Sequence, residues 1–419
     1  MSWLWLLINL VKNEVTEKKG ATGNYEEIGK WKRCFFSIVL ESTARGILIP
    51  IFSLIFLSRG FSLAQLPAGT AVCAAAILVF ELPGGIISDS IGRRKVFLYA
   101  QCLYFLSLII LLCEKIWYTT LFSMVLYGAA RAMSSGSMDA LLIDTYMLHE
   151  GQESLPKITA RLSAARGGGL ALGALAGGGF YQLGLAEDYG VEAAIVAAIL
   201  LTVFSGGTAF FFTREACCPS QTTKKDSLFS VLKWEKHLKI LFFTIILIGV
   251  FTSLIEIYWQ PYFSDLLRND SLMWLLGGLS FGYFGVAIMG SLAAERLLKK
   301  YLAATLFPKA YCLSGICLLL LSAIEHPAVF SVIYLLLYFF TGVGDTALLT
   351  SLNEKIPPYL RATVLSCQSF TFQVGGMMGA AISGLSVNSL TISGLWFIGG
   401  CIFMINMVIV YALQKWSMR

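Results

Sequence analysis

Ionisable side chains inside long apolar stretches are the residues of this chain that could carry chemistry. Glu41 and Arg45 lie four positions apart in one such stretch, so a helix would place them on one face. The two side chains could neutralise each other, or Glu41 could exchange protons while Arg45 modulates its proton affinity. The other candidates for proton coupling are Arg131, Asp139, Glu256 and Asp345.

The composition indicates that these charges lie in a lipid bilayer. Hydrophobic residues make up 57% of the 419-residue chain and charged residues 13%, whereas a soluble domain carries about 25% charged residues. Backbone groups in lipid must be hydrogen-bonded within the chain, so each apolar segment is expected to form a helix. We predict an all-α membrane protein with twelve transmembrane helices, at residues 34–58, 67–88, 96–113, 117–142, 161–184, 191–213, 240–264, 272–295, 302–323, 327–352, 361–385 and 391–414.

The longest polar stretch between these segments runs from Thr213 to His237 and follows the sixth of them. This position predicts two six-helix bundles related by pseudo-symmetry and joined by a linker. The apolar residues at the start of the chain are too few to cross a bilayer, which needs about 20. We therefore predict an N-terminal interfacial segment (1–31), an N-terminal bundle (32–213), a cytoplasmic linker (214–239) and a C-terminal bundle (240–419).

The distribution of lysine and arginine predicts the orientation. If both termini lie in the cytoplasm, the outer loops of a twelve-span chain contain only Arg59, Lys115 and Arg268. This asymmetry satisfies the positive-inside rule and favours a multi-pass protein of the cell inner (plasma) membrane. The net charge of +6 therefore reports topology, and we expect the lipid bilayer as a partner and no nucleic acid.

Several kinds of active site are not expected. The histidines are scattered and no cysteine pair has metal-ligand spacing, so we predict no metal site. No GxxxxGK[ST] sequence is present, which argues against direct use of ATP. We predict no catalytic residues and no cofactor.

A short charged motif joins the second and third apolar segments, with Gly85, Asp89, Gly92 and Arg93 at fixed spacing. At this location the motif resembles motif A of the major facilitator superfamily. The resemblance implies a conformational latch in which Asp89 contacts the start of the eleventh helix and Arg93 pairs with Asp144. Alternatively, the run of cations from Arg93 only anchors the loop in the cytoplasm.

A second resemblance lies in the fifth apolar segment, where four glycines match a pattern of drug–proton antiporters. Alanine stands at position 174, where that family has proline. Small residues four positions apart form one stripe on a helix and allow a neighbouring helix to approach closely. The helix-packing glycines are Gly169, Gly173, Gly177 and Gly178.

Aromatic residues next to Glu256 are candidates for a substrate cavity. A carboxylate among aromatic rings would attract a cation, and Tyr258 and Trp259 follow Glu256 directly. The same residues could instead belong to the aromatic belt at the membrane surface. Gln368 and Gln373 of the eleventh segment are further cavity candidates.

These observations predict a secondary active transporter rather than an enzyme. Rocking of two bundles would expose a mid-membrane site to each side in turn. The resemblance implies proton-coupled efflux of a small amphipathic molecule or drug, by a monomer. The alternative is a proton-coupled symporter that imports a small metabolite, and a membrane-embedded sensor or enzyme on this fold is a more distant one.

Overall fold

The computed structural model describes residues 25–151, 155–185, 189–213, 236–354 and 361–417, and every regular element among them is helical. In chain order the elements are α2 (Tyr25–Leu48), η1 (Ile49–Ile51), α3 (Phe52–Leu57), α4 (Leu66–Ile91), α5 (Arg93–Cys113), α6 (Trp117–Glu150), α7 (Leu155–Leu185), α8 (Gly190–Phe212), α10 (Lys236–Leu267), η3 (Asp270–Leu272), α11 (Trp274–Leu298), α12 (Ala303–Leu321), α13 (Pro327–Glu354) and α14 (Arg361–Ser417).

The twelve predicted membrane crossings are confirmed within this described part of the chain. The first crossing comprises α2, η1 and α3, because Pro50 interrupts the regular helix with a 3-10 turn. The last two crossings form one element, α14, which is broken at Thr391, where the backbone is non-helical (φ 60°, ψ 170°). Residues 214–235 of the predicted linker (214–239) and residues 1–24 of the predicted interfacial segment lie outside the described residues, whereas residues 236–239 begin α10.

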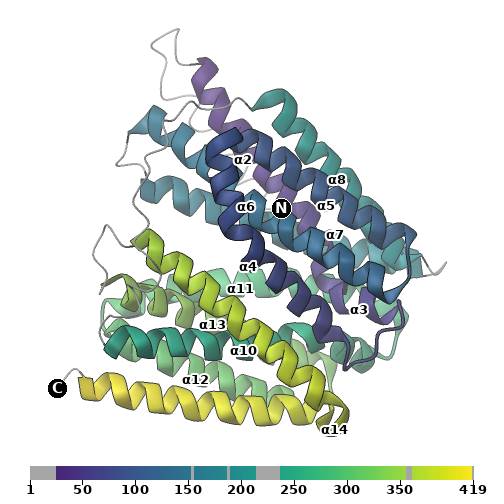
Figure 1. Ribbon diagram of the computed structural model, residues 1–419. Coiled ribbons are helices and arrows are strands. Elements are labelled where there is room, and N and C mark those ends of the chain that lie inside the picture. The colour runs from purple at the N-terminus through teal and green to yellow at the C-terminus, as the bar shows by residue number, and fades with distance from the viewer. Residues whose placement is uncertain (1–24, 152–154, 186–188, 214–235, 355–360, 418–419) are drawn as a thin grey trace.

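The helices form two bundles, which Figure 1 shows as a purple-to-teal group and a green-to-yellow group. We name α2 to α8 the N-terminal half and α10 to α14 the C-terminal half. In the N-terminal half α2 packs along α7, and in the C-terminal half α10 packs along α14. The helix pairs correspond in order along the two halves, as pseudo-symmetry predicts.

Glycines allow both of these helix pairs to approach closely. A Cβ atom added to Gly173 or Gly177 of α7 would lie 2.1 Å or 2.0 Å from a backbone oxygen of the first crossing. In the C-terminal half, a Cβ atom on Gly375 would lie 2.2 Å from the carbonyl oxygen of Ile246. Gly375 and Gly379 of α14 thus form a second small-residue stripe, which the sequence interpretation missed although its four-residue spacing is the same.

The two halves are hydrogen-bonded to each other at one end of the molecule. The Ser53 hydroxyl donates to the carbonyl oxygen of Ile257 (2.7 Å), and the Gln260 side chain donates to the carbonyl oxygen of Ile49 (2.7 Å). Backbones also meet there, because Gly178 of α7 packs directly on Gly277 of α11. We call this the sealed end. The opposite end, where α8 ends and α10 begins, is called the linker end.

Candidate substrate cavity

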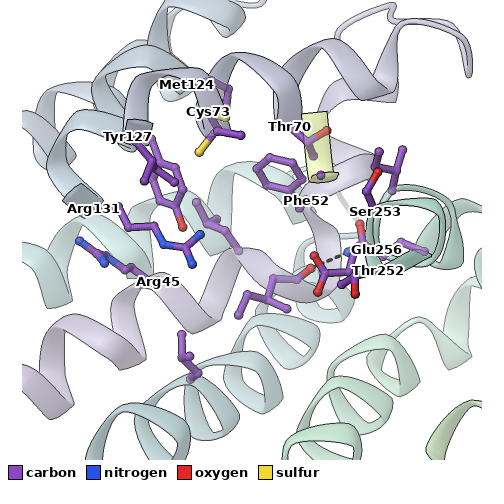
Figure 2. Close-up of a pocket in the computed structure, with 18 of the residues that line it drawn as sticks. Arg45, Phe52, Thr70, Cys73, Met124, Tyr127, Arg131, Thr252, Ser253 and Glu256 are labelled. Atoms are coloured by element: carbon purple, nitrogen blue, oxygen red, sulfur yellow. Dashed lines mark hydrogen bonds between the residues drawn. The ribbon is translucent and has the colours of Figure 1, made fainter. Parts of the chain in front are cut away.

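A cavity of about 480 Å³ lies between the two halves and is lined by residues of both. Its walls come from α2, α4, α5, α6 and α7 on one side and from α10, α11, α13 and α14 on the other. Figure 2 shows its lining side chains. The volume lies in the range of small-molecule sites, and the hydrogen bonds at the sealed end close the space between the halves on that side.

Arg45 lines this cavity, and its charge is neutralised by Glu41 of the same helix. Its guanidinium lies 2.7 Å from the Glu41 carboxylate. Glu41 is fully buried (0% exposed) and also accepts a hydrogen bond from the Ser134 hydroxyl of α6. The structure therefore brings the two residues together as an ion pair, while proton exchange at Glu41 stays a prediction.

Replacing Glu41 by glutamine is expected to destabilise the protein. The change leaves the Arg45 charge without its partner in an apolar surrounding, at a cost of about 3 kcal/mol, the lower end of the usual range because the cavity admits water. Thermal unfolding of the purified protein in detergent measures the effect. Glu354→Gln, an exposed carboxylate at the end of α13, is the control, and equal stability of the two variants would contradict the prediction.

A second ion pair connects α6 and α7. The Arg166 guanidinium donates to both carboxylate oxygens of Asp139, with a shortest distance of 2.6 Å. Arg166 lines the cavity, and the sequence interpretation did not single it out. It falls within the predicted fifth crossing, so the rule that intramembrane charges are functional candidates would have found it.

Arg131 and Glu256 are the cavity charges that form no ion pair within the described part of the chain. Both side chains line the cavity and are accessible from it. Among the described residues, neither makes an ion pair or a hydrogen bond, although Arg131 is close enough for electrostatic interactions with Glu256 and with Glu81 of α4. Figure 2 shows Arg131 beside Arg45 at one side of the cavity and Glu256 at the other.

The aromatic residues after Glu256 point in different directions. Trp259 lines the cavity, as do Tyr283 of α11 and Tyr338 of α13. Tyr258 is buried, and its hydroxyl donates to the carbonyl oxygen of Leu63 across the sealed end (3.3 Å). Consecutive residues of a helix lie about 100° apart, so Trp259 can face the cavity while Tyr258 faces the sealed end.

The two glutamines of α14 and Asp345 also differ in position. Gln373 lines the cavity, whereas Gln368 is half-buried and lies outside the lining. Asp345 of α13 accepts a hydrogen bond from the Tyr311 hydroxyl of α12, within the C-terminal half. Asp345 is therefore separate from the cavity charges.

The structure describes part of the predicted latch. Arg93 and Asp144 form an ion pair in which both side chains are partly exposed. Both residues belong to the N-terminal half, so their contact does not itself join the halves. Gly92 ends α4 with φ 104°, a conformation that favours glycine, and a Cβ atom on Gly85 would meet open space. The side chain of Asp89 lies outside the described residues.

Replacing Arg93 by alanine is expected to lower transport several-fold while the amount of inserted protein stays normal. The change removes the ion pair that fixes the start of α5 to the end of α6. Lys95→Ala, which removes an exposed cation from the same first turn of α5, is the control for loss of positive charge. Normal turnover of the Arg93→Ala protein would exclude the latch, and equal impairment of both variants would indicate an anchoring role.

Comparison with known proteins agrees with this architecture. The sequence profile of the Major Facilitator Superfamily matches residues 34–380. An uncharacterized MFS-type transporter of Bacillus subtilis (strain 168), YxaM, is 24% identical over 411 residues, covering 90% of this chain and 94% of the relative.

Two solved structures share the fold at low sequence identity. The nucleoside transporter NupG superposes with a TM-score of 0.71 at 12% identity, over 93% of this chain and 99% of that chain. A bacterial homolog of the human lysosomal transporter Spinster, in an inward-facing and occupied conformation, gives a TM-score of 0.76 at 11% identity, over 94% and 98%.

Proposed function

Because the chain belongs to the major facilitator superfamily, we propose that it exports a small amphipathic molecule by proton-coupled alternating access. The observation that carries the proposal is the cavity between the halves, which contains unpaired charge and is sealed at one end. Rocking of the halves would break the contacts at the sealed end and close the linker end, so that the same site faces each side in turn.

Glu256 is the residue to which we assign proton coupling. Glu41 and Asp139 each have an arginine partner, whereas Glu256 has neither an ion pair nor a hydrogen bond among the described residues. An unpaired carboxylate in a cavity can bind either a proton or a cationic group of the substrate. Competition between these two ligands for one carboxylate is sufficient for antiport.

The proposed orientation is compatible with export. We propose that the linker end lies on the cytoplasmic side of the plasma membrane, because the positive-inside rule favours that orientation. In that orientation the structure is sealed toward the outside, and a substrate of the proposed exporter would enter the cavity from the cytoplasm. The cavity is lined by residues of a single chain, which is compatible with the proposed function as a monomer.

The proposal is tested in everted membrane vesicles that carry a pH gradient. Addition of a transported compound is expected to collapse the gradient in vesicles with the protein, and not in vesicles from cells without it. An increase of the pH gradient, or uptake of the compound in the same direction as protons, would indicate symport instead. No response to any compound of a broad panel of amphipathic molecules would contradict proton antiport.

A further inference from the structure

We propose that the cavity takes a zwitterionic small molecule, with an acidic group bound by Arg131, an amine bound by Glu256 and an apolar, flat body between them. This inference rests on the proposed function, because it names the substrate class of the same cavity. It depends on the way in which the charges of the cavity are distributed between the two halves.

The cavity charges fall into two compensated pairs and two isolated groups. Arg45 is neutralised by Glu41 at 2.7 Å, and Arg166 by Asp139 at 2.6 Å. Arg131 and Glu256 remain, with opposite signs and on opposite halves. Arg131 also interacts electrostatically with Glu81, which is not part of the cavity lining and does not form an ion pair with it.

Isolated charges at this depth are unfavourable in the empty protein, and a ligand of matching charge would remove that cost. A carboxylate or phosphate on the ligand can pair with the guanidinium fork of Arg131. An ammonium group can pair with Glu256 and with the faces of nearby rings. A simple anion or a simple cation would satisfy only one of the two groups and would leave the other isolated.

The residues between the two charges indicate the body of the ligand. Phe52 lies between Arg131 and Glu256 in the view of Figure 2, and Tyr127 lies beside Arg131. Trp259, Tyr283 and Phe372 complete an aromatic lining on the C-terminal half. Such a wall favours a flat apolar body through stacking. Since Arg131 and Glu256 are too far apart to pair directly, the ligand charges should lie at opposite ends of that body.

The test compares three charge forms of each of two probe molecules on the purified full-length protein. The probes are 4-(aminomethyl)phenylacetic acid and the dipeptide Phe-Phe, each as the zwitterion, as the N-acetylated anion and as the carboxyl-blocked cation. Equilibrium binding should favour the zwitterion by at least about tenfold over either capped form, the equivalent of one ion pair. The proposal is overturned if neither zwitterion binds more tightly than its capped forms, which includes the case in which no form binds.

Three variants test which residue binds which charged group of the ligand. Arg131→Gln should reduce discrimination against the cation to within about threefold and retain discrimination against the anion. Glu256→Gln should have the reverse effect, and Arg131→Lys, which retains the charge, should restore part of the preference. If both glutamine variants lose affinity equally for all three charge forms, the assignment is overturned. Transport of other compounds with collapse of a pH gradient would show that the proposed function survives such a failure.

Discussion

Replacing Gly178 by alanine is expected to open the sealed end of the cavity and to reduce transport by at least about tenfold. The added Cβ atom would lie 2.6 Å from the Cα atom of Gly277 in the opposite half. Because this contact joins the two halves, the protein can relieve the clash by rocking them apart, without unfolding either bundle. The variant should therefore fold and favour the state that is open at this end.

Two neighbouring glycines provide matched controls for this experiment. Alanine at Gly179 would contact nothing within 4 Å and should leave transport unchanged. Alanine at Gly177 would lie 2.0 Å from the carbonyl oxygen of Ile47 in the same half, so its clash cannot be relieved by rocking and should lower the thermal stability instead.

Cys73, a cavity-lining cysteine, reports the state of the Gly178→Ala protein when every other cysteine is replaced by serine. A membrane-impermeant thiol reagent added outside intact cells should modify Cys73 in this variant and leave it unmodified in the parent. Equal protection of Cys73 in both proteins would contradict the role of the glycine contact.

Replacing Glu256 by glutamine is expected to abolish the dependence of transport on the pH gradient and to lower gradient-driven flux by at least about tenfold. Glutamine has nearly the same shape and cannot bind a proton in exchange for substrate. Stability should stay equal or rise, because the change removes an unpaired charge from the interior. Flux measured in proteoliposomes over a series of imposed gradients tests both statements.

Glu295→Gln is the matched control for Glu256→Gln, since Glu295 is an exposed carboxylate of α11 away from the cavity lining. It should behave as the parent protein at every gradient. Full gradient-driven flux in the Glu256→Gln protein would remove Glu256 as the coupling residue, and Asp139 or Glu41 would then be the groups to test.

The fold could be predicted from the sequence because the bilayer restricts the possible structures. Apolar segments of sufficient length had to be helices, and the helix ends follow the predicted limits closely at α5, α8 and α12. The 3-10 turn at Pro50 was missed, since a proline in an apolar run has the same hydropathy whether or not the helix continues there. The non-helical residue Thr391 lies at the predicted boundary between the eleventh and twelfth segments.

The candidate site was predictable only as a set of residue types. Glu41 and Arg45 share one helix, so their spacing was enough to suggest a pair. The Asp139–Arg166 pair joins two helices, and a single sequence contains no register between them. For the same reason the direction of Tyr258 was not predictable, since it depends on how the segment between α3 and α4 packs against α10.

The most direct test of alternating access is a pair of distance measurements by spin labelling on the same protein. One label pair, at Ser62 and Ser389, spans the halves at the sealed end, and the other, at Lys95 and Lys300, spans them at the linker end; all four positions are exposed. Shifting the pH to change the protonation of the cavity should lengthen one distance while it shortens the other. Distances that stay constant, or that lengthen together, would contradict a transporter that works by rocking of two halves around one cavity.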